Sequence, residues 1–120
     1  MDIKVSIGEI IDKLSILEVK KNKIVDTEKL KNITIEYDYL LEKLKPLAIG
    51  EYSELYDVNL LLWDVEDNIR IKENMKEFDD EFIMFARKVY FFNDKRAEIK
   101  RRINIKYNSE FIEEKSYEKY

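Results

Sequence analysis

The sequence predicts an all-α protein, and three observations lead to this prediction. The 120 residues include only two Gly and one Pro, too few for the many turns of a β-rich domain. Apolar residues recur at spacings of three and four along most of the chain, which is the period of an amphipathic helix. At this length the chain forms one domain, residues 1–120. We expect an antiparallel up-down four-helix bundle, or a long helical hairpin completed by dimerisation.

Two shorter helices are expected first, over about 6–24 and 27–45. Ser6 and Glu9 have the spacing of a capping box, which satisfies free N–H groups at a helix start. Pro46 ends the second helix because proline cannot donate a hydrogen bond within a helix. The predicted loop is Leu47–Glu51, which contains Gly50.

Two longer helices are expected over about 52–74 and 79–106, each roughly 35–40 Å long at 1.5 Å per residue. The third helix is apolar nearly all the way round, which is typical of a helix surrounded by others. The fourth carries a heptad-type apolar stripe, and Arg96 occupies a stripe position where an apolar residue is expected. The tail, 109–120, is expected to dock as a short segment or to fray.

The absence of His and Cys excludes several kinds of site. Without Cys there is no disulfide, thiol nucleophile or iron–sulfur centre. Without His there is no Ser-His-Asp triad and no His-ligated metal. Apolar runs fall far short of the ~18 residues that cross a bilayer, and no secretory leader is visible. We therefore expect a cytoplasmic protein that does not enter a membrane.

Charge is distributed unevenly behind the net charge of −4. Residues 51–81 carry 11 acids and 3 bases, whereas residues 82–120 carry 6 acids and 10 bases. Complementation of the helix dipoles is one interpretation. The other is that the basic end binds a phosphate-bearing or other anionic small ligand. Duplex DNA is not an expected partner because the chain as a whole is acidic.

A cluster of polar side chains is predicted between the two long helices. Glu66 and Arg70 share one helical face with Trp63. Arg96 in an apolar stripe must either be paired or point at a ligand. Two interpretations stay open: an anion-binding site, and an ion-pair network between the helices. The full cluster comprises Glu66, Arg70, Arg87, Asn93, Asp94 and Arg96.

Paired carboxylates offer an enzymatic alternative, a Mg²⁺-dependent nucleotide pyrophosphohydrolase. Glu51 and Glu54 have E-x-x-E spacing, and Glu77 and Asp80 have E-x-x-D spacing. All-α enzymes of that class use such pairs to share Mg²⁺ ions that bridge substrate phosphates. No cofactor is expected outside this alternative. A second conceivable carboxylate set consists of Glu66, Asp67, Asp94 and Glu98.

The charged side chains of the first helix, Asp12 among them, are expected to be solvated. The preferred prediction is a non-catalytic helical binding or assembly module. We expect it to form a homodimer, because the apolar surface of the long helices exceeds what two short helices can cover.

Three segments, 5–18, 62–70 and 86–97, resemble a family of short, uncharacterised helical proteins. They read VSIGEIIDKLSILE, LWDVEDNIR and ARKVYFFNDKRA. The resemblance covers most of the chain and implies no activity.

Overall fold

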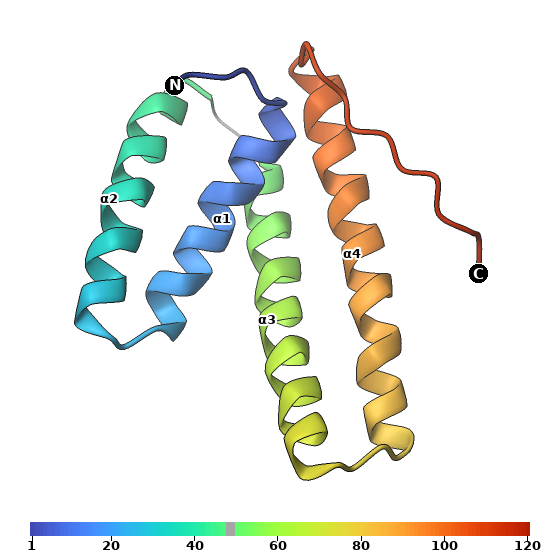
Figure 1. Cartoon of the computed structure of the whole chain (residues 1–120). Coiled ribbons are helices and arrows are strands. Elements are labelled where there is room, and N and C mark those ends of the chain that lie inside the picture. Colours follow the sequence, from blue (N-terminus) through green and yellow to red (C-terminus); the bar gives the residue numbers. More distant parts are fainter. Residues whose placement is uncertain (48–49) are drawn as a thin grey trace.

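Four helices run alternately in opposite directions along the computed structural model, which describes residues 1–47 and 50–120 (Figure 1). None of the described residues forms a strand. The predicted all-α antiparallel bundle is therefore confirmed, and each helix boundary lies within one residue of its expected position. The helices are α1 (Ile7–Lys23), α2 (Thr27–Leu44), α3 (Glu51–Met75) and α4 (Asp80–Lys106).

Side-chain caps define the helix starts as the local sequence predicts. The Ser6 hydroxyl accepts a hydrogen bond from the Glu9 backbone N–H, and the Asp79 carboxylate accepts one from Phe82. The Glu9 side chain does not return to Ser6 as in a full capping box; it pairs instead with Lys100. Residues 48–49 of the predicted loop lie outside the described residues.

Three helices enclose the main core. Ile11 of α1, Leu55 and Val58 of α3, and Ile99 and Ile103 of α4 are almost fully buried together. Within the described chain the α2 backbone packs on α1 and approaches neither α3 nor α4. A second apolar cluster fills the α1–α2 contact and consists of Leu14, Leu17 and Leu40.

A glycine allows α1 to approach α4 closely. The Gly8 backbone N–H donates to Asn104 Oδ1 at 2.6 Å. A Cβ atom built on Gly8 would lie 2.6 Å from the carbonyl oxygen of Lys100, so a larger residue would force the two helices apart. This contact fixes the separation between α1 and α4 and positions the polar groups that follow along both helices.

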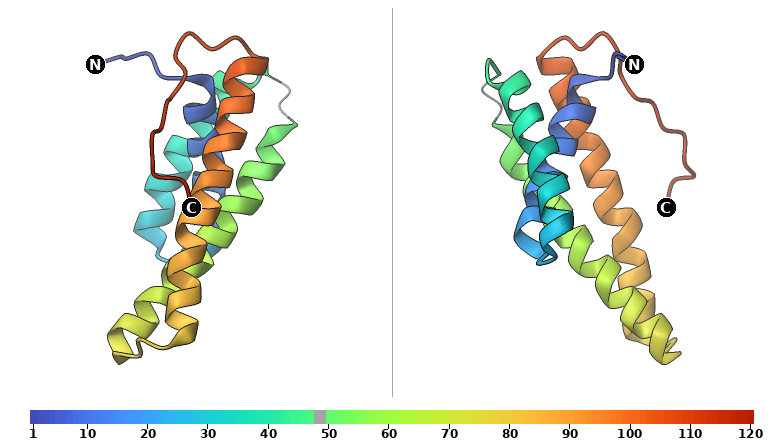
Figure 2. Two further views of the ribbon diagram at one scale, coloured as in Figure 1. Left: turned by 90° about the vertical axis from the view of Figure 1, so that its right-hand side faces the viewer. Right: turned by 60° about the vertical axis from the view of Figure 1, so that its left-hand side comes forward.

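The α3–α4 hairpin continues well past the turn between α1 and α2 (Figure 2). Val65 is the last buried residue of α3, and Ile99 is the first of α4, so no residue from 66 to 98 is buried. The polypeptide after α4 turns back along that helix. None of the helices, among the residues described, is long and apolar enough to cross a membrane.

Candidate functional site

An ion pair between a buried aspartate and a half-buried arginine joins α1 to α4. Asp12 is 1% exposed, and Arg96 Nε lies 3.0 Å from its Oδ1 and 3.1 Å from its Oδ2. Arg96 Nη2 also bonds to Oδ2. This two-pronged geometry is the one in which a guanidinium matches a carboxylate. Hydrogen bonding to Asp12 raises the pKa of Arg96 above its usual value, so the guanidinium is charged and held in one orientation.

Asn59 and Ser15 complete the network around Asp12. Asn59 Nδ2 donates to Asp12 Oδ1 at 2.9 Å and to the Ser15 hydroxyl at 2.8 Å. The same hydroxyl donates to the Asp12 backbone carbonyl at 2.7 Å. Among the described residues, every buried side-chain polar atom has a hydrogen-bond partner. The buried charge is thus compensated on all sides, which is the condition for keeping an ion pair away from water.

An open cleft of about 370 Å³ adjoins this network where α1 crosses the α3–α4 groove. Small-ligand sites usually measure about 300–1,000 Å³ and combine apolar walls with a few fixed polar groups. The cleft has both components. Its lining residues are Ile16, Val19, Asn59, Leu62, Trp63, Glu66, Asp67, Arg70, Asn93 and Arg96.

The cleft brings together Glu66, Arg70, Asn93 and Arg96 from the predicted cluster. Arg70 Nη1 bonds to the Glu66 carboxylate one turn away and to the Glu66 backbone carbonyl at 3.0 Å. Asn93 Nδ2 donates to the Val89 carbonyl at 2.9 Å within α4. Both arginines are therefore ion-paired, yet the space between the helices remains open. Neither arginine pairs between α3 and α4, as the network interpretation expected: Arg70 pairs within α3, and Arg96 pairs with Asp12 of α1.

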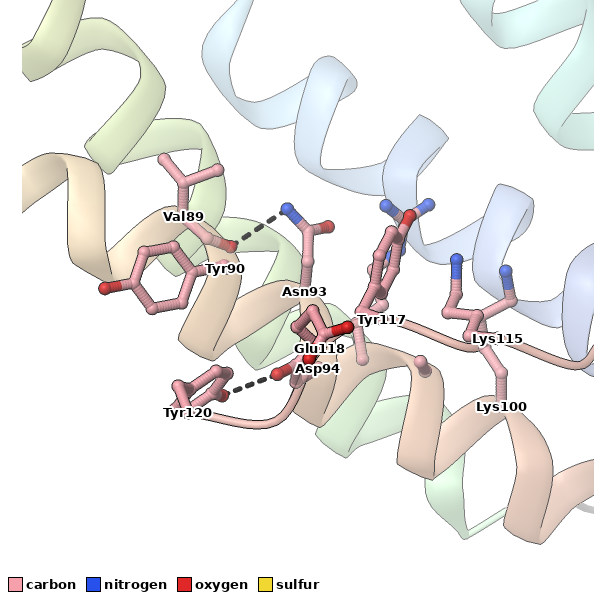
Figure 3. A pocket seen from close by; sticks show the side chains of 11 residues that line it. Val89, Tyr90, Asn93, Asp94, Lys100, Lys115, Tyr117, Glu118 and Tyr120 are labelled. Atoms are coloured by element: carbon pink, nitrogen blue, oxygen red, sulfur yellow. Dashed lines mark hydrogen bonds between the residues drawn. The ribbon is translucent and has the colours of Figure 1, made fainter.

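Asp94 and Arg87, the other two predicted residues, lie outside this cleft. Asp94 lines a second hollow of about 610 Å³ between α4 and the tail, where the Tyr120 hydroxyl donates to its carboxylate (Figure 3). The guanidinium of Arg87 lies 5.5 Å from the centre of the Phe91 ring and lines neither hollow. Asn93 and Arg96 line both hollows, so Asp94 shares the second hollow with two members of the predicted cluster, whereas Arg87 lies apart from both.

The tail is docked on α4 rather than frayed. Arg101 forms an ion pair with Glu114 at 2.8 Å. The Tyr120 ring lies 5.3 Å from Tyr90 and 5.2 Å from Phe91. These contacts are on the surface, since every residue from 110 to 120 is exposed. The second hollow therefore depends on exposed tail contacts, whereas the cleft is built by three helices.

Asp12 is the principal site residue that the sequence analysis missed, and the expectation that it is solvated was wrong. It belongs to a second buried face of α1, which faces α4 and lies next to the apolar stripe. Small and polar residues recur there at helical spacing, but apolar periodicity does not mark such a face as buried. That face consists of Gly8, Asp12, Ser15 and Val19, all buried.

The paired-carboxylate alternative was wrong in its geometry. Glu51 and Glu54 open α3, whereas Glu77 and Asp80 follow its far end, about 37 Å away at 1.5 Å per residue. Their charges are used locally: Glu51 pairs with Lys106 and Glu54 with Arg102, while Glu77 pairs with Lys72 in the hairpin turn. The second carboxylate set, Glu66, Asp67, Asp94 and Glu98, does not form a metal site either. In residues 1–47 and 50–120 no group of three or more acids is placed to hold a metal ion.

One family model matches the chain, over residues 1–120, and its description is Family of unknown function (DUF6165). No curated protein and no solved structure matches the chain. The match confirms the resemblance to an uncharacterised family. It assigns no chemistry, so a function has to be argued from the cleft itself.

Proposed function

The chain belongs to the DUF6165 family, and we propose that it is a non-catalytic binding protein that holds a small polar ligand in the α1–α3–α4 cleft. The observation that carries this proposal is the open cleft beside a fully satisfied buried network. A purely structural network would close over its polar groups; this one leaves some of them at an open surface. The cytoplasmic location expected from the sequence stays part of the proposal.

Several polar groups in the cleft are pre-positioned for a ligand. Asp12 engages Nε and Nη2 of Arg96, which leaves Nη1 as a donor on a guanidinium that is already fixed. Asn93 donates to its own helix through Nδ2, which leaves its side-chain amide oxygen, Oδ1, as an acceptor. Groups ordered before binding lose little conformational entropy when the ligand arrives, so binding costs less.

The charge balance favours a ligand rich in hydroxyl groups. The lining residues include two acids, Glu66 and Asp67, and two bases, Arg70 and Arg96, so the cleft has no excess of positive charge. Hydroxyl groups both donate and accept, and they suit a mixture of carboxylate, amide and guanidinium groups. The Trp63 ring supplies a flat apolar surface of the kind on which the carbon face of a sugar packs.

An anionic group, such as a phosphate, is the second ligand chemistry. The Arg70 side chain is 70% exposed and is paired only within α3. A pair of this kind stabilises a helix by a few tenths of a kcal/mol. Arg70 can therefore exchange its ion pair with Glu66 for one with a ligand phosphate at little cost. A sugar phosphate would use this contact through its phosphate and the other polar groups of the cleft through its hydroxyl groups.

Trp63 is the single tryptophan of the chain and reports directly on the cleft. We propose titrating its fluorescence with glucose, inorganic phosphate and glucose 6-phosphate. We expect saturable changes with glucose and, more strongly, with glucose 6-phosphate. Saturation by phosphate alone would assign the cleft to anions. If none of the three probes gives a saturable change, the proposal is wrong.

A pair of matched variants separates cleft binding from general effects. Asn93→Ala removes a lining amide whose only hydrogen bond within the described residues is to its own helix, so the fold should tolerate it. Asn68→Ala removes an exposed amide elsewhere on α3. We expect Asn93→Ala to weaken binding about tenfold, the equivalent of one hydrogen bond, and Asn68→Ala to leave it unchanged. Equal effects from both variants would contradict binding in the cleft.

A further inference from the structure

The second hollow, here called the α4–tail hollow, has the helix α4 on one side and the extended tail on the other. It measures about 610 Å³, and small-ligand sites usually measure about 300–1,000 Å³. The tail residues in its lining are Lys115, Tyr117 and Glu118, followed by Tyr120. Just before them Glu114 pairs with Arg101 of α4, and at their end the Tyr120 hydroxyl donates to Asp94. The outer wall is therefore placed before a ligand arrives, which lowers the entropy lost on binding.

The two ends of the α4–tail hollow differ in chemistry. On α4 its lining includes Tyr90 and Lys100, which are ten residues, or about 15 Å, apart along the helix. The tail runs back along α4, so the Tyr120 ring lies 5.3 Å from Tyr90. Figure 3 shows these two tyrosines at one end, Lys100 and Lys115 at the other, and Tyr117 between them. The hollow thus has an aromatic end and a basic end.

The basic end presents two ammonium groups to an anion. Lys100 Nζ lies 2.8 Å from a Glu9 carboxylate oxygen and 3.9 Å from one of Glu113. Lys115 Nζ lies 3.4 Å from the same Glu113 oxygen. The Lys100 side chain is only 10% exposed, so its ammonium group is held in place. Both distances to Glu113 exceed the roughly 2.7–2.9 Å of a good charge-assisted hydrogen bond, and exposed ion pairs contribute little to stability. A phosphate group can therefore take the place of Glu113.

The aromatic end suits a flat ring that carries hydrogen-bond donors. The Tyr117 side chain is 76% exposed, so a planar ring can stack on it, and stacking of bases on aromatic side chains stabilises binding. The carboxylates of Asp94 and Glu118 also line the hollow. A carboxylate accepts about four hydrogen bonds, so Asp94 can accept further bonds beside the one from Tyr120. The ring and amino N–H groups of a nucleobase are donors of the kind that such acceptors bind.

We infer that the α4–tail hollow binds a nucleoside diphosphate, with the base at the aromatic end and the phosphates at the basic end. The separation of the two ends favours this class of ligand. Free phosphate reaches only the basic end, and a ring joined directly to its anionic group is too short for both. In a nucleotide the ribose separates the base from the phosphates. The proposal is one of binding without a chemical step, and it does not depend on a ligand in the α1–α3–α4 cleft.

The test is isothermal titration calorimetry of the full-length chain with ADP and UDP, and with adenosine and inorganic pyrophosphate as the two halves of ADP. We expect saturable binding of at least one nucleotide. We expect each half to bind at least tenfold more weakly than ADP, because it reaches one end only. Pyrophosphate or adenosine binding as tightly as the nucleotides would overturn the inference, since one end would then suffice. Failure of both nucleotides to bind would also overturn it.

Two matched pairs of variants locate the site. Lys115→Ala and Tyr117→Ala each remove a lining side chain, and we expect each to weaken nucleotide binding about tenfold. Lys119→Ala, in the same tail, and Tyr39→Ala, on α2, are the controls and should leave binding unchanged. All four positions are exposed, so the fold should tolerate every variant. Equal effects within either pair would contradict binding in the hollow.

The same variants distinguish this site from the cleft. The fluorescence of Trp63 in response to glucose 6-phosphate should be the same in Lys115→Ala and Tyr117→Ala as in the wild type, because neither side chain lines the cleft. Loss of that response together with nucleotide binding would overturn the assignment of two separate sites. Retention of nucleotide binding without any response to glucose 6-phosphate would refute the proposed function and leave the inference standing.

Discussion

Replacing Asp12 by Ala tests the buried network most severely. The change leaves the Arg96 guanidinium without its carboxylate, at a side chain that is only 27% exposed. Breaking a buried ion pair by removing one partner costs about 3–5 kcal/mol. Because Arg96 retains some contact with water, we expect the lower end, about 3 kcal/mol. For 120 residues this lowers the Tm by about 12 °C, since the entropy of unfolding is about 2.1 cal/mol/K per residue.

Urea denaturation followed by circular dichroism at 222 nm measures this loss. The informative comparison is the double variant Asp12→Leu/Arg96→Met, which replaces both charges by apolar side chains of similar size. Removing both members of a buried pair is often nearly neutral, so the double variant should be more stable than Asp12→Ala. Asp57→Ala, at an exposed aspartate of α3, is the surface control and should stay within about 0.5 kcal/mol of wild type.

Two results would refute this reasoning. A loss below about 1 kcal/mol for Asp12→Ala would mean that the pair is solvated like a surface ion pair. If the stability loss of Asp12→Leu/Arg96→Met equals the sum of the losses of Asp12→Leu and Arg96→Met alone, then Asp12 and Arg96 are not energetically coupled.

Three further predictions concern the scaffold. Gly8→Ala should lower the free energy of unfolding in urea by about 1–3 kcal/mol because its Cβ meets the α4 backbone. Gly50→Ala has open space around its Cβ and should be neutral or slightly stabilising. Equal effects of the two variants would contradict the close approach of α1 to α4. Cap hydrogen bonding lowers the pKa of Asp79 below its ordinary 3.8. The stability that this cap gives α4 is therefore complete above pH 3.8 and is lost as the pH falls through the lower pKa of the folded state. Amide exchange at the start of α4 should accelerate in that acid range, and Asp79→Ala should show the fast exchange already at neutral pH. Tyr52→Phe removes a 2.6 Å hydrogen bond to Glu18 and should cost about 1 kcal/mol, measured by the same urea unfolding; an unchanged midpoint would show that this bond contributes nothing.

The helix boundaries followed from the sequence because they depend on local chemistry. Ser6 caps α1 with its own hydroxyl, and Asp79 caps α4 in the same way. Pro46 cannot continue a helix, and α2 ends just before it. Each of these signals acts within three or four residues, so no knowledge of the tertiary structure is needed to apply it.

The site was only half predictable, because the ion-pair partner of a residue can lie far from it in the sequence. The sequence correctly marked Arg96 as a charge in an apolar stripe that needs a partner. That partner, Asp12, lies 84 residues earlier in the chain. Hydrophobic periodicity identifies one buried face of a helix, but α1 has two, and the second is made of small and polar residues. Only the packing of α1 against α4 shows that this second face is buried.

The carboxylate alternative failed for a reason that helix length alone could have supplied. Residues that begin and end a helix of 25 residues are separated by about 37 Å. Motif spacing describes neighbours within a helix and says nothing about whether two motifs meet. In this protein the four carboxylates lie at opposite ends of α3.

The most direct test of the proposed function is an NMR titration that follows the nitrogen-bound side-chain protons. The Trp63 indole and the amides of Asn59 and Asn93 line the cleft, whereas Asn32 and Asn68 are exposed elsewhere. With glucose 6-phosphate as the probe, we expect saturable shifts at the three cleft groups and none at Asn32 or Asn68. Unchanged cleft signals, or shifts spread equally over all five groups, would contradict a ligand site in the cleft.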